Sequence, residues 1–321
     1  MNYKYSCPAI FLIGPTAVGK TDLAISLVDK FQIEIVSIDS AMVYSELDIG
    51  TCKPSKEILK LKKHHLIDIL EPTEKFDVGV FLDHLDAAML SITSNNKIPI
   101  FVGGSMMFHK ILFDGIHNFP SSQKVRSMIQ DQKLNEGYEK LLEQLQELDE
   151  ITFKSIDTNN YRRVERALEI IELSNQKLSD LKKEPKEQFF DPKKSLILGM
   201  TDSKENLLDT AKKRLNKILD DGFLIELENL INSYKLTADM QSMNSINYKQ
   251  FYPYAFGKMK LDESFADALS ATNQLIKTQL TWMKKFDFDD CMNQSNQKKP
   301  MFFSDTINTY LRALINELES K

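Results

Sequence analysis

The chain has 321 residues, of which 42% are hydrophobic and 27% are charged, and its formal net charge at pH 7 is −5. This is typical of a globular protein with a sizeable core in one large domain or two. The acidic balance argues against a wholly basic surface, although 41 lysines and arginines leave room for a local basic patch. Separated cysteines without a C-x-x-C pair indicate reduced thiols. No apolar run approaches the roughly 20 residues of a membrane span, and no signal peptide is evident, so we expect a soluble, cytoplasmic protein.

The first motif along the chain is G-x-x-x-x-G-K-T at residues 14–21, which predicts a phosphate-binding loop. An apolar run at 9–13 predicts a buried strand before it, and helical spacing at 22–28 predicts a helix after it. The glycines would let backbone N–H groups point at phosphate oxygens, Lys20 would reach the terminal phosphate, and Thr21 would hold Mg²⁺. A chance strand–turn–helix is the structural alternative. The residues expected to hold a diphosphate or triphosphate are Gly14, Pro15, Thr16, Ala17, Val18, Gly19, Lys20 and Thr21.

Two further predicted strands end beside this loop. One covers residues 34–39 and ends at Asp39, and the other covers 98–102 and is followed by Gly103-Gly104-Ser105. The carboxyl ends of parallel strands face the ligand crevice of an α/β sheet, so we expect the three ends to converge. Asp39 is then a turn cap, a Mg²⁺ partner or a general base beside the phosphates. Ser105 either belongs to a tight turn or donates a hydrogen bond to a ligand.

The middle of the chain predicts a helical insertion. Residues 121–190 are highly charged and helical in pattern, with a helix start at 157–160 and a loop at 181–190. A strand pattern returns at 195–200, and the chain from about 204 onward reads as helical. We therefore predict an α/β fold with a P-loop NTPase-like parallel sheet flanked by helices. The core would comprise residues 1–120 and 191–321, and the helical insertion domain residues 121–190.

Basic residues form two groups with open interpretations. Arg162, Arg163 and Arg166 lie in a predicted helix, where they either form a solvated face with nearby glutamates or bind phosphate groups. The same alternatives apply to Lys53, Lys56, Lys60, Lys62 and Lys63. The aromatic residues near the C-terminus, Trp282 among them, belong to the core or stack on bases.

Taken together, these landmarks resemble the bacterial tRNA dimethylallyltransferase (tRNA isopentenyltransferase) family over about residues 10–286. The matching blocks, in order, are GPTAVGKT, SIDSAMVYSELDIGTCKP, HHLIDILEP, IPIFVGGSMMFHKILFDGI, NNYRRVERALEI, SINYKQ and QLTWMKKF. The phosphate loop taken alone suggests an ATPase or kinase. The resemblance implies instead that this loop holds a leaving group.

The resemblance implies an enzyme that uses dimethylallyl diphosphate and Mg²⁺. Its acceptor would be the exocyclic amine of the adenosine 3′ of the anticodon, in tRNAs that read codons beginning with U, and its products N6-dimethylallyladenosine and diphosphate. Lys20 and Mg²⁺ on Thr21 would stabilise the departing diphosphate, Asp39 would deprotonate the amine, and Ser105 would contribute a hydroxyl. The insertion would clamp the anticodon stem-loop of the tRNA, and the enzyme would act as a monomer. The implied tRNA contacts are Asp39, Ser40, Ala41, Met42, Ser105, Arg126, Arg162, Arg163 and Arg166.

The sequence departs from the family pattern at a few positions. Ser105 replaces Thr and keeps a hydroxyl, whereas Phe108 replaces Tyr and lacks the phenol. Asn247 stands where Gly is usual, and asparagine tolerates a positive φ better than most residues. Lys249 replaces Arg, and Asn273 and Thr278 replace residues that are often basic, which predicts weaker phosphate contacts and a shallower salt dependence.

Three other functions share part of this pattern. An enzyme that prenylates free adenine nucleotides would share the loop and Asp39, but it needs no RNA-clamping insertion. A small-molecule kinase would use ATP and needs neither the insertion nor the C-terminal helices. A non-catalytic RNA-binding protein with a vestigial loop is disfavoured by the intact Lys20, Thr21 and Asp39.

Overall fold

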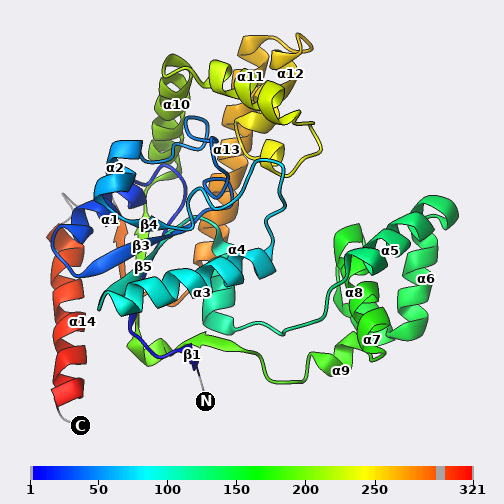
Figure 1. The fold of residues 1–321 in the computed structure, drawn as a ribbon, viewed down its shortest axis with the longest axis horizontal. Coiled ribbons are helices and arrows are strands. Elements are labelled where there is room, and N and C mark those ends of the chain that lie inside the picture. Colours follow the sequence, from blue (N-terminus) through cyan, green and yellow to red (C-terminus); the bar gives the residue numbers. More distant parts are fainter. Residues whose placement is uncertain (1–2, 294–300, 320–321) are drawn as a thin grey trace. The chain divides into compact units, whose positions relative to one another are not determined.

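The structure of the chain is a computed structural model that describes residues 3–293 and 301–319. These residues form two compact units. The core unit comprises residues 5–113 and the described residues from 190 onward, and the helical unit comprises residues 114–189 with Tyr3 and Lys4. Figure 1 labels their helices and strands. The boundaries between the units, at 113/114 and 189/190, lie near the predicted ones at 120/121 and 190/191. The division into a catalytic core and a tRNA-clamping insertion stays a prediction.

The core unit is built on a parallel sheet with strand order β4-β3-β5-β2-β7-β8. Ile13 and Ile38 both lie opposite Gly103 in the ladder, so the carboxyl ends of three neighbouring strands are level. This confirms the predicted α/β class and the predicted convergence of strand ends. The strands are β2 (Ala9–Ile13), β3 (Ile33–Ile38), β4 (His64–His65), β5 (Ile98–Gly103), β7 (Ser195–Thr201) and β8 (Asp290–Asn293).

Helices flank this sheet and complete the core. Ile10 and Leu12 pack with Leu23 of the first helix, Leu207 of α10 and Ile276 of α13 in one buried cluster. None of the described helices is long and apolar enough to cross a membrane. The helical elements of the core unit are α1 (Lys20–Val28), α2 (Lys56–Leu61), α3 (Val78–Ser94), α4 (Met106–Asp114), η1 (Pro192–Lys194), α10 (Lys204–Asp220), α11 (Phe223–Tyr234), η2 (Ser242–Asn244), α12 (Tyr248–Ala255), α13 (Leu261–Met283) and α14 (Met301–Glu319).

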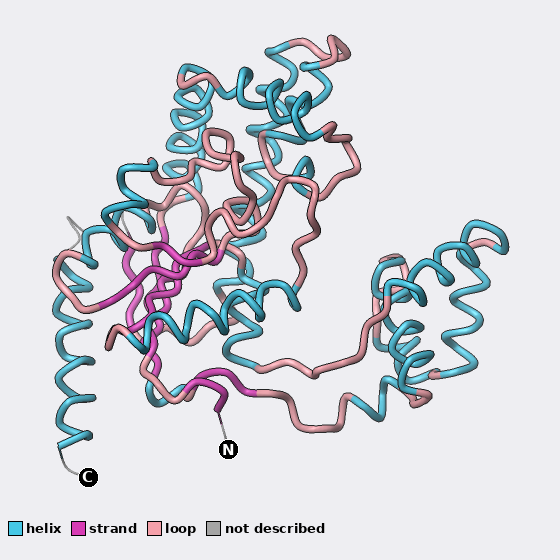
Figure 2. Tube along the Cα trace, in the orientation of Figure 1, coloured by secondary structure: helices cyan, strands magenta, loops and turns pink. Residues whose placement is uncertain are grey.

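The helical unit has its own apolar centre, which includes Leu141, Leu145, Val164 and Leu168. Asn160 caps α8 by accepting a hydrogen bond from the Arg163 N–H at 3.4 Å, so the predicted helix start at 157–160 is confirmed. Figure 2 shows that this part of the chain is drawn mainly as helix. Its helices are α5 (Gln123–Glu136), α6 (Tyr138–Leu148), α7 (Glu150–Ser155), α8 (Tyr161–Ser174) and α9 (Leu178–Leu181).

Two short strands correct the sequence prediction. The predicted loop at 181–190 is wrong at its end, because β6 (Gln188–Phe190) pairs with β1 (Tyr3–Tyr5) in a two-stranded sheet. The predicted all-helical C-terminal region is likewise interrupted by β8, which extends the main sheet beside β7. Both strands are stabilised by partners far away in the sequence. Local composition carries little signal for such pairing.

A buried carboxylate organises the start of the helical unit. Glu169 is 1% exposed, and its oxygens accept hydrogen bonds from the Ser122 N–H at 2.8 Å, Arg126 at 3.0 Å and Arg166 at 2.7 Å. Arg166 also donates to the carbonyls of Phe119 and Pro120. Burial raises the pKa of Glu169, but these hydrogen bonds outweigh it and hold the pKa below its usual value. Glu169 and Arg166 therefore hold the segment 119–122 against α8, and Arg126 adds a further donor to Glu169.

We expect Glu169→Ala to lower the free energy of local unfolding in the helical unit by about 2–3 kcal/mol, because two guanidinium groups and a backbone N–H would lose their acceptor. The measurement is native-state hydrogen exchange of the α8 amides in the full chain. Glu172→Ala, at an exposed position of the same helix, is the matched control and should change it by less than about 0.5 kcal/mol. Equal effects of the two changes would contradict the bracing role.

Candidate active site

The loop between β2 and α1 has the backbone geometry of a tight anion-facing turn. Gly19 precedes α1 with a φ of 81°, and Ala17 has a φ of 67°. A side chain on Gly14 would place its Cβ 2.5 Å from the carbonyl oxygen of Met200. No side chain caps α1, so the amides of its first turn remain available to an anion.

Lys20 places a buried amine at this turn. It is 8% exposed, and its Nζ donates a hydrogen bond to the Pro15 carbonyl at 2.6 Å. Burial, and next the charge of Arg214, lower the pKa of Lys20 to about 7, whereas the charge of Asp39 opposes the shift. The two cations repel each other. A bound anion would relieve that repulsion, so this end of the cavity suits a phosphate group.

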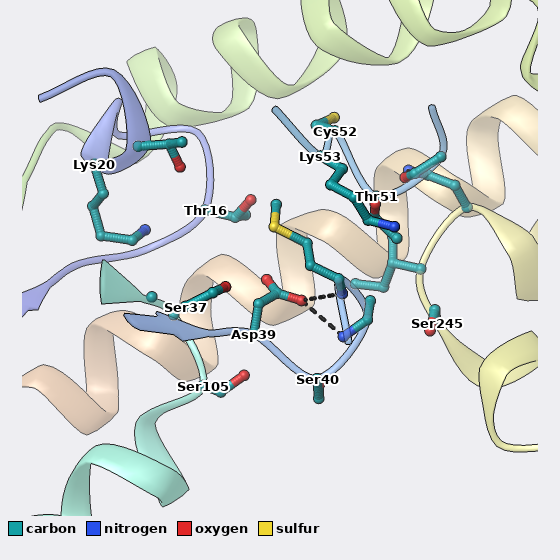
Figure 3. A pocket seen from close by; sticks show the side chains of 18 of the residues that line it. Thr16, Lys20, Ser37, Asp39, Ser40, Thr51, Cys52, Lys53, Ser105 and Ser245 are labelled. Carbon is teal, nitrogen blue, oxygen red and sulfur yellow. Dashed lines mark hydrogen bonds between the residues drawn. The ribbon is translucent and has the colours of Figure 1, made fainter. Parts of the chain in front are cut away.

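Asp39 follows β3 and is held by its own turn. Its Oδ1 accepts hydrogen bonds from the N–H groups of Ala41 at 2.8 Å and Met42 at 3.1 Å (Figure 3). The turn-cap interpretation is therefore confirmed. The geometry orients the carboxyl group and leaves Oδ2 to face the cavity, whose lining includes Asp39. The roles as Mg²⁺ partner and general base stay predictions.

Ser105 follows β5 in a turn where Gly103 and Gly104 have no room for a side chain. A Cβ on Gly103 would lie 2.0 Å from the Ile38 carbonyl oxygen, and a Cβ on Gly104 would lie 2.3 Å from the side-chain nitrogen of Gln279. The tight-turn interpretation of this segment is confirmed. Ser105 also lines the same cavity as Asp39, so its hydroxyl is available to a ligand there.

These residues surround one cavity of about 1300 Å³ in the core unit. Gly14, Pro15 and Val18 stand behind it: Gly14 packs against Met200, Pro15 offers its carbonyl to Lys20, and Val18 is buried in the core. The predicted arginines Arg126, Arg162, Arg163 and Arg166 belong to the helical unit. The predicted residues that line the cavity are Thr16, Ala17, Gly19, Lys20, Thr21, Asp39, Ser40, Ala41, Met42 and Ser105.

The cavity also contains Arg214 and Gln279, which the sequence analysis did not select, and Trp282, for which it left a core or a base-stacking role open. Arg214 lies on α10, where the run AKKRLNKIL reads as a solvated basic face. A signal was present, because Arg214 is three residues after Ala211 and four before Ile218, and both of these are buried. Gln279 and Trp282 reach the cavity from α13.

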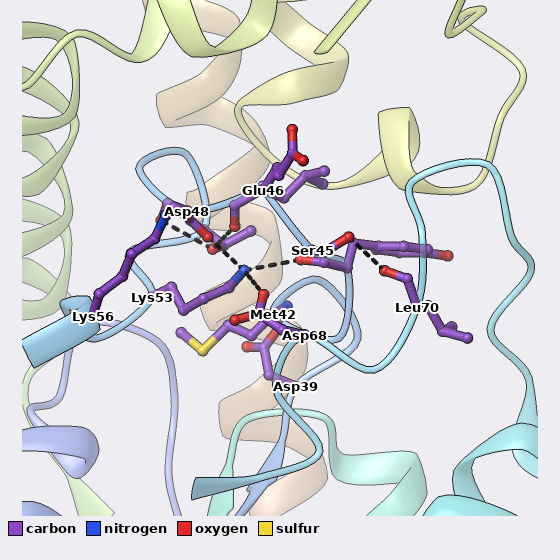
Figure 4. A network of polar contacts seen from close by, with 12 residues as sticks. Asp39, Met42, Ser45, Glu46, Asp48, Lys53, Lys56, Asp68 and Leu70 are labelled. Atoms are coloured by element: carbon purple, nitrogen blue, oxygen red, sulfur yellow. Dashed lines mark hydrogen bonds and ion pairs between the residues drawn. The ribbon is translucent and has the colours of Figure 1, made fainter. Parts of the chain in front are cut away.

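One wall of the cavity is fixed by a buried lysine. The side chain of Lys53 is 2% exposed, and its Nζ donates to Asp48 at 2.7 Å, Asp68 at 2.5 Å and the Tyr44 carbonyl at 2.9 Å (Figure 4). Lys56 lies 3.8 Å from the other oxygen of Asp48. Lys53 therefore belongs neither to a solvated basic face nor to a phosphate-binding patch, the two interpretations left open for these lysines. Its charge is paired inside the protein.

A carboxylate from α11 also holds this wall of the cavity, at residues 48–50. Glu226 accepts hydrogen bonds from the backbone N–H groups of Asp48, Ile49 and Gly50, and from the hydroxyl of Tyr248 at 2.6 Å. Asn247 adopts a φ of 75°, which confirms the predicted positive φ, and its side-chain nitrogen donates to the Gly50 carbonyl at 2.7 Å. Glu226 and Asn247 thus both hold the backbone of residues 48–50.

The oxygen donors at the cavity fit a magnesium ion that would also be held by phosphate oxygens of a bound substrate. Among the described residues, no group of three or more His, Cys, Asp or Glu side chains is placed to hold a metal. Thr21 and Asp39 offer a hydroxyl and a carboxylate at the cavity. Mg²⁺ prefers oxygen donors and commonly keeps water and phosphate oxygens in its shell, so these two residues fit such an ion. The Mg²⁺ site stays a prediction.

Comparisons with known proteins agree on one family. A family model described as IPP transferase matches residues 42–286. A solved tRNA delta(2)-isopentenylpyrophosphate transferase from Staphylococcus epidermidis is 30% identical, with 95% of this chain and 99% of that chain covered and a TM-score of 0.67. A full-length tRNA isopentenylpyrophosphate transferase from Bacillus halodurans is 28% identical, with 98% and 99% covered and a TM-score of 0.69. A eukaryotic dimethylallyltransferase acting on tRNA is 26% identical, with 90% and 74% covered and a TM-score of 0.77.

We expect inorganic diphosphate to bind with net proton uptake by Lys20 above pH 7. The pKa of Lys20 is about 7, and a bound anion would favour the charged amine, so the Lys20 contribution to affinity weakens as pH rises above 7. With one proton taken up, the limit is about a tenfold loss per pH unit. Titration calorimetry in buffers of different ionisation enthalpy measures the uptake. Lys20→Met should bind more weakly and lose this component, leaving only the protonation of the diphosphate. Identical uptake in both proteins would refute the assignment.

Proposed function

The chain belongs to the IPP transferase family, a family of enzymes, and on this premise we propose that it transfers a dimethylallyl group to tRNA. The donor is dimethylallyl diphosphate. The acceptor is the exocyclic amine of the adenosine 3′ of the anticodon, in tRNAs that read codons beginning with U. The three similar solved proteins all carry tRNA in their names, which supports this acceptor. The observation that carries the proposal is a carboxylate, Asp39, oriented beside a cationic end of a large cavity.

The cationic end suits a leaving group. The 14–21 loop, Lys20 and Arg214 bind the diphosphate, and the bond that breaks is the one between the allylic carbon and its oxygen. The electron pair stays on the departing diphosphate, where negative charge grows. Cations already in place stabilise that charge without having to reorganise. Thr21 would hold Mg²⁺, which when bound supplies further charge neutralisation on the diphosphate.

Asp39 accepts the proton of the attacking amine. Its Oδ1 is occupied by two backbone N–H groups, so Oδ2 is the oxygen that takes the proton as the new nitrogen–carbon bond forms. An adenine amine is a weak nucleophile, so holding it in line with the allylic carbon contributes much of the rate. The adenosine leaves the anticodon-loop stack to reach the cavity.

The helical unit supplies contacts to the tRNA backbone. Arg162 and Arg163 are exposed on the first turn of α8, where they are available to phosphate groups. Arg126 and Arg166 hold Glu169, but their side chains remain about 40% and 39% exposed, so each can also meet a phosphate at its outer edge. We assign the principal contacts to Arg162 and Arg163.

The defining assay is incubation with dimethylallyl diphosphate and unmodified tRNA, followed by mass analysis of nucleosides. We expect Asp39→Asn to lower turnover by about 10²–10⁴-fold, because an amide keeps the turn cap but cannot accept the proton. Its affinity for inorganic diphosphate should stay within a few-fold of the parent. Near-normal turnover would remove Asp39 from the chemistry, and product from AMP in place of tRNA would favour a free nucleotide as acceptor.

We expect the Arg162→Ala, Arg163→Ala double variant to raise the KM for tRNA about tenfold and to leave the KM for dimethylallyl diphosphate unchanged. The slope of log KM against log salt should become shallower by about 1–2, because two phosphate contacts are lost. The control removes the same charge from the same unit with Lys182→Ala and Lys183→Ala, both exposed. If the two double variants behave alike, only net charge matters and the arginines make no specific contact.

A further inference from the structure

A buried amide stands at the meeting point of the cavity loops. Gln279 is 5% exposed, and it lies on α13 between the buried side chains of Ile276 and Met283. A buried amide without partners would cost free energy, so its presence on an otherwise apolar face needs a reason. The chemistry described above does not use this residue.

Both ends of the Gln279 amide are hydrogen-bonded to backbone groups of the cavity. Its oxygen accepts from the Thr16 N–H at 2.8 Å, and its nitrogen donates to the Gly104 carbonyl at 3.0 Å. A backbone N–H can only donate and a carbonyl can only accept, so the orientation of the amide is fixed by its partners. The side chain is therefore a bridge of defined direction between two segments.

The two bridged segments carry different parts of the site. Thr16 belongs to the loop after β2, and Gly104 to the turn after β5 that presents Ser105. The strands are neighbours, with Ile13 opposite Gly103, so the segments leave the sheet side by side. Figure 3 shows the side chains of Thr16 and Ser105 in the same pocket view as Asp39. A Cβ on Gly104 would lie 2.3 Å from the Gln279 nitrogen, so a glycine is required for this contact.

We propose that Gln279 is a positioning residue for the transfer reaction, which sets the spacing between the diphosphate loop and the Ser105 turn. The proposal rests on the proposed function, because it concerns the alignment of donor and acceptor. The loop holds the diphosphate, whereas Ser105 and Asp39 lie where the acceptor amine must approach. Misplacing reacting groups by about 1 Å can cost roughly 100-fold in rate, so a bridge that fixes this spacing acts on kcat.

The bridge differs from an ordinary core contact in what its loss does. A residue with only a structural role would lower thermal stability and leave kcat intact in the folded enzyme. A positioning residue would lower kcat while the diphosphate still binds, because Lys20, Arg214 and the amides of α1 hold that ligand without Gln279. The two roles therefore separate in one set of measurements.

The test compares Gln279→Met, which keeps the length of the side chain and removes both hydrogen bonds, with Gln279→Glu, which keeps an acceptor for Thr16 and loses the donor to Gly104. Gln274→Met, at an exposed position of the same helix, is the matched control. At a temperature where all four proteins are folded, we expect Gln279→Met to lower kcat at least tenfold, with the affinity for inorganic diphosphate within about threefold. Gln279→Glu should also lower kcat, because its carboxylate faces a carbonyl, and Gln274→Met should match the parent.

Hydrogen exchange supplies a readout that does not depend on turnover. In Gln279→Met, the backbone amides of segments 14–19 and 103–105 should both exchange faster, because the Gln279 side chain bonds both segments. An unchanged kcat in Gln279→Met, or faster exchange in neither segment or only one, would overturn the proposal. Failure of the proposed function looks different: the parent and Gln274→Met would then form no prenylated nucleoside, while the exchange comparison would still decide whether Gln279 couples the two segments.

Discussion

The parallel ladder places Ile13, Ile38 and Gly103 at one height, and the positions of the proposed site residues depend on that register. Each strand delivers one component at the same edge: the 14–21 loop, the Asp39 turn and the Ser105 turn. A shift of one residue in any of them would turn its last side chain to the opposite face of the sheet. The glycines and the Asp39 cap then fix the short distance between each strand end and its functional group. Backbone hydrogen bonds, more than side-chain contacts, thus determine where the proposed site residues lie.

Charge within the cavity is distributed unevenly in a way that suits one anion. Lys53, Lys56 and Lys217 line it, but each pairs with a carboxylate of the chain. Lys20 instead donates to a carbonyl, and burial and the charge of Arg214 lower its pKa. Positive potential therefore concentrates at the 14–21 loop, even though the chain carries a net charge of −5. An acidic protein can still bind phosphate groups when a few cations are left unbalanced in a shielded place.

The sequence was sufficient for the parts that depend on local pattern. The apolar runs of β2, β3 and β5 and the glycine spacing predicted the sheet edge and the three strand ends that meet there. The strands β1, β6 and β8 escaped because each is short and pairs with a segment remote in the sequence. Gln279 and Arg214 escaped because polar residues on amphipathic helices normally face water, and burial depends on which helix packs where. The spacing left Arg166 either paired with nearby glutamates on a solvated face or bound to phosphate; it does pair with Glu169, but that carboxylate is buried, which spacing alone does not reveal.

The carboxylate of Glu226 has a consequence for ligand choice. Three consecutive backbone N–H groups, those of Asp48, Ile49 and Gly50, converge on it. Such a concave run of amides is a nest, a common receptor for phosphate or carboxylate anions. Here the nest is occupied by the Glu226 carboxylate of the same chain, which also accepts a hydrogen bond from the Tyr248 hydroxyl. Because the chain's own carboxylate already satisfies these three amides, they cannot compete with the 14–21 loop for the diphosphate of the proposed reaction.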